Sequence, residues 1–141
     1  MPHHHQKRIL PYTPKQMYDL VADVSKYQEF LPWCVGTRIN WRKADSLNAD
    51  VLIGYKAIRE IFTSTVTLTP YEAISVHYER GPFSKLQNYW TFVEHPQGCE
   101  VEFFIDFEFR ASLLNSIIKS FFEEAVKRMI DAFEKRAKVI Y

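Results

Sequence analysis

The side chains that could act as acids, bases or nucleophiles are scattered along this 141-residue sequence. Asp19 and Asp23 are four residues apart on a predicted helix and could work as paired carboxylates, but they lie on its polar side, where solvated carboxylates are commoner. The two internal histidines, His77 and His95, fall on a polar strand face and in a turn. The sequence contains no nucleophile elbow, HExxH zinc motif or phosphate-binding glycine loop. We therefore expect a protein that is not an enzyme.

The cysteines and the N-terminal histidines are the remaining candidates for metal binding. Cys34 and Cys99 form neither a CxxC pair nor a Cys/His spacing typical of zinc, so we expect no metal and no cofactor. Cys34 has no evident histidine partner, which favours a small buried thiol in a reducing compartment. The run His3, His4 and His5 has two interpretations, a metal tract or tag and a set of polar residues that open a first strand.

The composition is typical of one globular domain spanning residues 1–141. Hydrophobic residues make up 47% of the chain, charged residues 25% and aromatic residues 16%, which excludes a disordered chain. The formal net charge is +1, so no overall attraction to nucleic acid is encoded and we expect no DNA partner. No apolar run reaches the roughly 18–20 residues of a membrane span, and residues 1–10 lack the apolar segment of a secretory signal. These observations predict a cytoplasmic protein.

A strand and a short helix are predicted at the start of the chain. Residues 4–10 suit a strand. Thr13 suits the N-cap of the following helix, Pro14 suits its first position, and Gln16 completes a capping box with Thr13. Residues 25–33 then predict a second helical turn or an aromatic-rich loop.

From Cys34 onward, the spacing of apolar residues changes from 3.6 to 2, which predicts six consecutive strands. The last of them, residues 100–109, is the clearest, because apolar residues alternate with acidic ones and Phe104 is the only exception. The strand side chains expected on the apolar face are Val51, Ile53, Val66, Trp90, Phe103, Ile105 and Phe107.

A final helix is predicted over residues 112–138, with Ser112 as its cap and a length of roughly 40 Å. Six antiparallel strands, a first strand at the sheet edge and one long helix predict an α+β fold, in which a curved antiparallel sheet wraps around the C-terminal helix. The apolar stripe of the helix contains Leu114, Ile118, Phe121, Ala125, Met129 and Ala132.

Small residues on the predicted C-terminal helix affect whether the space between this helix and the sheet is hollow or filled. Ala125 and Ala132 face the sheet in this prediction. They could leave an apolar hollow, as occurs where helices cover curved sheets, or they could let the helix and the sheet pack closely. Both alternatives stay open on the pattern alone.

One predicted turn combines backbone-breaking residues with an aromatic ring. Gly81, Pro82 and Phe83 lie between two predicted strands. Phe83 looks exposed there and could act as a lid or touch a lipid surface. The alternative is a plain hairpin turn with Phe83 folded back.

Three segments of the sequence resemble motifs of one known family and follow one another in the same order. Residues 18–34 (YDLVADVSKYQEFLPWC) closely resemble the opening motif of the coenzyme Q-binding protein family, which belongs to the START, or polyketide-cyclase-like, superfamily. Residues 80–83, followed by Leu86, Trp90 and Phe92, are similar to its second motif. The residues that resemble its ending are Phe133, Arg136, Ala137, Val139 and Tyr141. The resemblance covers nearly the whole chain and implies the helix-grip fold.

The resemblance also implies a ligand. It implies that a cavity between the sheet and the long helix binds ubiquinone or a similar polyprenyl lipid, in support of respiratory electron transport or quinone biosynthesis. Peripheral contact with the inner membrane would accompany that role. The ligand-binding residues would be the seven strand residues named above with Ile118, Phe121, Ala125, Met129 and Ala132, and the lid would be Gly81, Pro82 and Phe83.

Two alternatives accompany the quinone hypothesis. A bacterial branch of the same family resembles a ribosome-directed toxin that blocks subunit association. The basic residues that could contact a ribosome are Lys127, Arg128, Lys135, Arg136 and Lys138. The other alternative is a polyketide-cyclase-like enzyme acting on an apolar substrate, which the lack of buried acid/base candidates disfavours.

Overall fold

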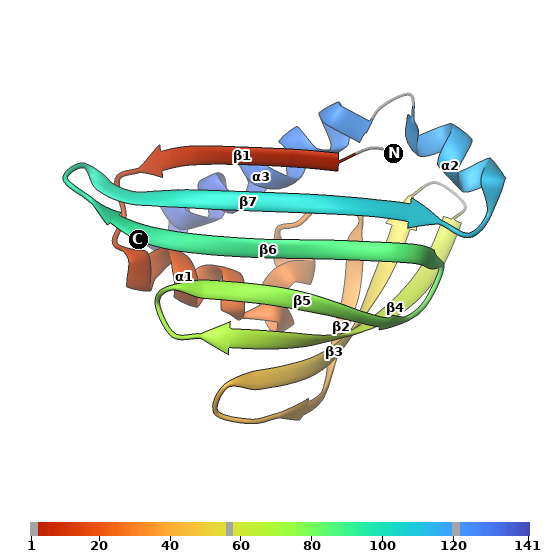
Figure 1. Cartoon of the computed structure of the whole chain (residues 1–141), viewed down its shortest axis with the longest axis horizontal. Helices are drawn as coiled ribbons and strands as arrows, with labels where there is room; N and C mark the ends of the chain where they lie inside the picture. Colours follow the sequence, from red (N-terminus) through yellow and green to blue (C-terminus); the bar gives the residue numbers. More distant parts are fainter. Residues whose placement is uncertain (1–2, 56–57, 120–121) are drawn as a thin grey trace.

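The helices of this protein lie against one face of an antiparallel sheet (Figure 1). The structure is a computed structural model that describes residues 3–55, 58–119 and 122–141. Within these ranges, the strands are β1 (His3–Leu10), β2 (Cys34–Arg42), β3 (Ser46–Tyr55), β4 (Ile58–Thr69), β5 (Ala73–Arg80), β6 (Phe83–His95) and β7 (Gly98–Phe109). The helices are α1 (Pro14–Ala22), the 3-10 helix η1 (Val24–Glu29), α2 (Ser112–Lys119) and α3 (Phe122–Ile140).

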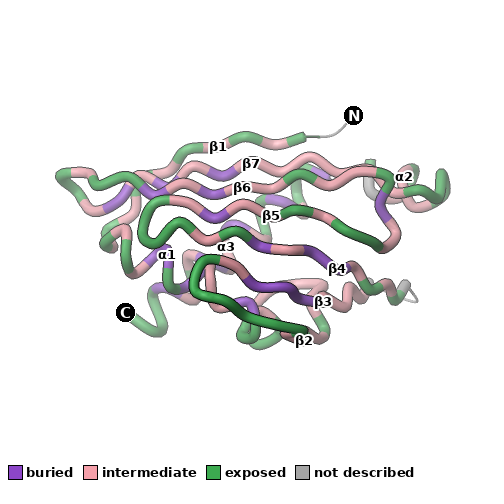
Figure 2. Tube along the Cα trace, turned by 60° about the horizontal axis from the view of Figure 1, so that its bottom comes forward, coloured by how far each residue is buried: buried purple, intermediate pink, exposed green. Residues whose placement is uncertain are grey.

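The strand order is β1-β7-β6-β5-β4-β3-β2, so β2 to β7 form a meander in which each strand pairs with the next. β1 pairs instead with β7, from His3 opposite Asp106 to Leu10 opposite Cys99. The edge strand β2 is exposed over much of its length (Figure 2). The sheet curves around α3, which confirms the predicted α+β fold with a curved antiparallel sheet (Figure 1).

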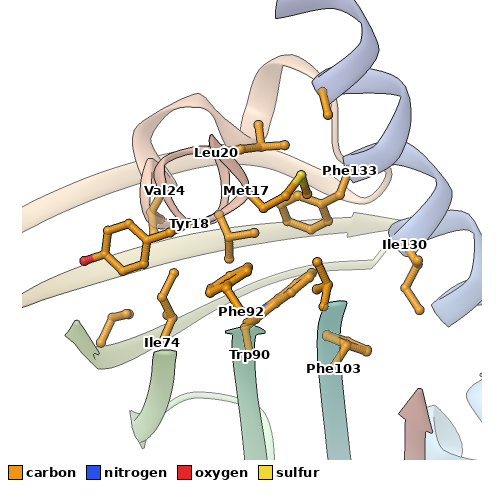
Figure 3. Close-up of a cluster of buried hydrophobic side chains, with 14 of the residues drawn as sticks. Met17, Tyr18, Leu20, Val24, Ile74, Trp90, Phe92, Phe103, Ile130 and Phe133 are labelled. Carbon is orange, nitrogen blue, oxygen red and sulfur yellow. The ribbon is translucent and has the colours of Figure 1, made fainter. Parts of the chain in front are cut away.

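The core forms where α1 and α3 meet the middle of the sheet. Met17 of α1 is 1% exposed and Phe133 of α3 is 3% exposed. The ring of Phe133 lies 4.9 Å from that of Trp90 on β6. Figure 3 shows side chains from both helices and from the strands pointing toward one another. Burial of these apolar side chains holds the helices on the concave face, at about 25 cal/mol for each Å² removed from water.

The capping box predicted at the start of α1 is present. The backbone N–H of Gln16 donates to Thr13 Oγ1 at 3.1 Å, and the backbone N–H of Thr13 donates to Gln16 Oε1 at 2.9 Å. Pro14 follows in the first helical position, as expected. The cap therefore fixes where α1 begins.

The single helix expected over residues 112–138 is divided. α2 and α3 run in different directions (Figure 1), and residues 120–121 lie outside the described ranges. Asn115 of α2 holds the end of β7, because the backbone N–H of Phe109 donates to Asn115 Oδ1 at 2.8 Å and Asn115 Nδ2 donates to the Phe109 carbonyl at 2.7 Å. α2 therefore follows the end of the sheet, whereas α3 packs on the core. No helix in the described part of the chain is long and apolar enough to cross a bilayer.

The N-terminal histidines open strand β1, as the second interpretation of that run predicted. His5 Nε2 lies 2.6 Å from Glu102 Oε2 on β7. This hydrogen bond holds the pKa of the Glu102 carboxyl below its usual value. Across the described residues, no group of three metal-ligating side chains comes together.

Candidate ligand-binding cavity

An apolar cavity of about 310 Å³ lies between the concave face of the sheet and the helices α2 and α3. Its volume is at the lower end of the range of about 300–1,000 Å³ found for ligand sites. Strand residues reach it because every second side chain of a strand points to the same face. The predicted residues that line it are Val51, Ile53, Val66, Trp90, Phe103, Ile105, Phe107, Ala125 and Met129. The hollow is therefore present at Ala125, and the binding role of these residues stays a prediction.

Three predicted helix residues are not among the lining residues that the structure describes. Ala132 is half-buried but does not line the cavity. The next residue, Phe133, lines it instead, and its ring packs on Trp90. Phe121 and the side chain of Ile118 lie outside the described part of the structure.

The exposed position predicted for Phe83 is wrong. Phe83 is the first residue of β6 and is only 4% exposed, because its ring folds back into the cavity wall. The rings around it belong to Phe62 at 5.5 Å, Tyr78 at 5.6 Å, Phe107 at 5.6 Å and Phe109 at 4.9 Å. The hairpin-turn alternative describes this geometry, and a gating role for Phe83 would require this cluster to open.

Gly81 and Pro82 form the turn and do not line the cavity. Gly81 has a φ of +146°, a conformation that favours glycine. A Cβ atom at this position would lie 2.7 Å from the Cβ of Phe62. The backbone N–H of Arg110 donates to the Pro82 carbonyl at 2.8 Å, which ties the turn to the end of β7. The turn is therefore tied to the end of β7 and has no room for a side chain at position 81.

One wall of the cavity was not predicted. It comes from η1 and the segment that leads into β2, and its lining residues are Val24, Tyr27, Leu31, Pro32, Trp33 and Cys34. These residues fall within the 18–34 segment that resembles the family's opening motif. That motif was the available signal, since no periodic pattern places a loop of this kind against a sheet.

A comparison with known protein families identifies the family of this chain. The family described as polyketide cyclase / dehydrase and lipid transport matches residues 10–134. The chain belongs to this polyketide cyclase and lipid transport family.

Two named proteins and one solved structure show how similar the chain is to known proteins. The ribosome association toxin RatA of Rickettsia prowazekii is 38% identical over 137 residues, which cover 94% of each chain. The mitochondrial coenzyme Q-binding protein COQ10 homolog B of Xenopus laevis is 32% identical over 141 residues, which cover 96% of this chain and 58% of that protein. The crystal structure of TTHA0849 from Thermus thermophilus superposes with a TM-score of 0.84 at 15% identity, covering 98% of both chains, and this likeness shows the fold alone.

Few ionisable groups line the cavity in this member of the polyketide cyclase and lipid transport family. Tyr27 donates its hydroxyl hydrogen bond to the Val21 carbonyl, and burial raises its pKa. Burial also raises the pKa of the Cys34 thiol. Glu60 of β4 is the remaining ionisable side chain among the described lining residues. The cavity is therefore suited to neutral, apolar molecules.

We expect iodoacetamide to alkylate Cys34 slowly at pH 7–8. Its raised pKa leaves less reactive thiolate at that pH than an ordinary cysteine has, so the rate should keep rising as the pH passes above the usual thiol range. A molecule held in the cavity should slow the reaction further, because Cys34 lines it. Mass spectrometry of the alkylated protein over time measures this rate. In the Cys34→Ser variant, only the buried Cys99 remains, and fast labelling of that variant would contradict the assignment.

Proposed function

We propose that this protein associates with the ribosome and blocks the joining of its subunits. The support is the similarity to the Rickettsia ribosome association toxin, at 38% identity over 94% of both chains. The similarity to the coenzyme Q-binding homologue is lower, at 32%, and spans 58% of that protein. We therefore favour association with the ribosome as the main function, although the sequence alone favoured quinone binding.

The basic stretch on α3 is the surface that we propose for this contact. Its arginines form ion pairs, with N–O distances of 3.0 Å from Arg128 to Glu124 and 2.8 Å from Arg136 to Glu29. The exposed lysines of the stretch, without an ion pair among the described residues, are Lys127, Lys135 and Lys138. Because the chain has a net charge of only +1, attraction to RNA phosphates must come from a local surface of this kind.

Addition of the protein to purified ribosomal subunits should lower the fraction of joined ribosomes on a sucrose gradient. The protein should also sediment with one of the subunits at moderate salt. The Lys135→Glu variant should lose much of both effects, because it reverses a charge on the proposed surface. Lys7→Glu is the matched control, since Lys7 is an exposed lysine on β1. An unchanged gradient with the wild-type protein would refute the ribosome proposal.

A second proposal concerns the cavity, which we infer holds an apolar ligand of the polyprenyl quinone type. The observation that supports it is the apolar cavity of about 310 Å³ between sheet and helix. The similarity to the coenzyme Q-binding homologue agrees with it. A cavity near the lower size limit suits a ring with a short part of its tail, so the rest of a long tail would stay outside, at a membrane surface. Such a role would place the protein peripherally at the inner membrane.

Mass spectrometry of an organic extract tests the second proposal. The protein is purified without detergent, extracted with organic solvent, and compared with an equal amount of an unrelated protein from the same cells. We expect a polyprenyl quinone at a substantial molar ratio to the protein. An extract without any enriched apolar compound would refute ligand binding while leaving the ribosome proposal standing.

We propose that neither role involves catalysis. A cyclase would need a general acid or base beside its substrate, with a pKa near the working pH. Burial raises the pKa of Tyr27 and Cys34, so neither group is available as a base near neutral pH, and the Tyr27 hydroxyl already donates to the Val21 carbonyl. Glu60 is the remaining ionisable side chain among the described lining residues, which gives it no second acid or base to work with. Incubation with an aromatic polyketide precursor should therefore give no product beyond the uncatalysed background.

A further inference from the structure

We propose that Ser64 donates a hydrogen bond to an oxygen atom of the molecule held in the cavity. Ser64 lies on β4, lines the cavity and is 3% exposed. Its hydroxyl oxygen is buried and has no hydrogen-bond partner among the residues that the structure describes. The proposal rests on the second proposed function, that the cavity holds an apolar ligand, and it adds the polar group that this ligand must carry.

The neighbours of Ser64 on the same strand show that its hydroxyl is an exception. Thr63 Oγ1 donates to Asp50 Oδ1 at 2.6 Å, and Thr65 Oγ1 donates to a carboxylate oxygen of Glu79. Because side chains alternate along a strand, these threonines point away from the cavity and Ser64 points into it. The outward hydroxyls are satisfied, whereas the buried inward one is not. A buried hydroxyl without a partner is unfavourable, so such groups usually meet a ligand, an ion or a water molecule.

The polar side chain opposite Ser64 in the sheet already has hydrogen-bond partners. Ser64 lies opposite Ala49 on β3 and Tyr78 on β5. The Tyr78 hydroxyl donates to the Phe83 carbonyl at 2.9 Å and accepts from the Phe83 backbone N–H at 3.1 Å. Glu60 lies four residues away on the same strand, about 13 Å at the usual rise per residue. The partner of Ser64 must therefore come from the cavity itself.

Asn88 of β6 is the other polar side chain that lines this part of the sheet. Its Nδ2 donates to the Phe104 carbonyl at 2.8 Å, so its orientation is fixed by the sheet. One amide hydrogen of Asn88 is thus directed at the backbone, and Ser64 is the lining hydroxyl without a hydrogen-bond partner among the described residues.

These contacts define the class of ligand. No cationic side chain is among the described lining residues, so a carboxylate or phosphate head group would be desolvated there without a counter-charge. A carbonyl oxygen on an otherwise apolar ring needs only one neutral donor. The structure thus favours a neutral molecule with a carbonyl group placed against β4 and hydrocarbon on either side of it.

Duroquinone and durene test the proposal, because they share one methylated ring and differ by two carbonyl oxygens. Duroquinone carries a methyl group at every free ring position, so it has no open site for addition of the Cys34 thiol. Binding of each is measured by displacement of the fluorescent probe N-phenyl-1-naphthylamine. The proteins compared are the wild type, Ser64→Ala and Ser64→Thr, each checked for folding by its melting temperature. The ratio of the two affinities is the quantity of interest.

We expect the preference of the wild type for duroquinone over durene to fall by roughly three- to tenfold in Ser64→Ala, as loss of one hydrogen bond implies. Ser64→Thr, which keeps the hydroxyl, should retain the preference. An equal preference in the wild type and Ser64→Ala would overturn the role of Ser64 and would indicate that a bound water satisfies it. If neither compound displaced the bound probe, the cavity would not hold a ring of this kind and the inference would be overturned, whereas ligand binding in general is tested by the organic extract.

Discussion

Replacement of Phe83 with alanine should lower the free energy of unfolding by about 3–5 kcal/mol, the range typical of a buried phenylalanine. The reason is its position, since it is 4% exposed within a cluster of four other aromatic rings. The hydroxyl of Tyr78 also holds the backbone of Phe83, so loosening of this residue would disturb the start of β6. Urea unfolding followed by circular dichroism measures the change.

Phe104→Ala provides a matched control for this prediction. Phe104 is a half-buried phenylalanine of β7, and its ring stacks on Tyr89 at 5.3 Å. Replacing this half-buried ring with alanine removes less buried apolar surface than replacing the ring of Phe83, so the loss of stability should be clearly smaller. If Phe83→Ala unfolded like the wild type but took up quinone poorly from vesicles, the packing role would be wrong and the earlier lid hypothesis would gain support.

The largest effect on ligand binding is expected from Ala125→Trp. Ala125 lines the cavity on α3, and an indole ring at this position would occupy space that an apolar molecule needs. The variant should stay folded and should lose quinone binding by at least about tenfold, equivalent to roughly 1.4 kcal/mol. Titration with decylubiquinone and thermal unfolding of the same sample measure the two properties.

Lys127→Trp is the control, because it places the same ring on the exposed side of α3. That variant should bind quinone like the wild type. If Ala125→Trp failed to fold, the site would be packed too tightly for the ring, since overpacking costs about 1–3 kcal/mol or more. A folded Ala125→Trp variant with unchanged binding would place the ligand elsewhere in the protein.

The strands were predictable because each one obeys a local rule. In β7, acidic and apolar residues alternate, and the structure places Val101 and Phe103 in the core. The exception, Phe104, falls on the opposite face, where its ring stacks on Tyr89 of the neighbouring strand β6. The cap at Thr13 was predictable for the same reason, because all the atoms of a capping box lie within four residues.

The predictions that were wrong depend on contacts between residues that are far apart in the sequence. The sequence shows Phe83 beside Gly81 and Pro82 and so suggests exposure, but its burial depends on Phe62 and Phe109 on other strands. Likewise, the spacing of the apolar residues over 112–138 gives no sign that the C-terminal helix is divided into two. The contact of the Asn115 side chain with the backbone of Phe109, which holds α2 at the end of β7, is equally invisible in that pattern.

The cavity was predictable in part for a related reason. Strand periodicity identifies which side chains face inward, and the seven strand residues that it placed on the apolar face all line the cavity, but others such as Phe62 and Ser64 were left out. It does not reveal whether the space opposite is filled, nor that Tyr27 and Trp33 close it from another segment. The unpartnered hydroxyl of Ser64 was also beyond reach, since a serine among threonines on a strand carries no sign of its surroundings.

The pairing of β1 with β7 imposes an order on folding. Leu10 and Cys99 lie opposite each other in the sheet but are 89 residues apart in the sequence. All other strand pairs join neighbours in the chain, so they close short loops and can form early. β1 therefore stays unpaired until β7 has been synthesised. Until β1 pairs with it, the open edge of β7 is the segment most exposed to mispairing. Pulsed hydrogen exchange during refolding should accordingly show the amides of β1 protected last.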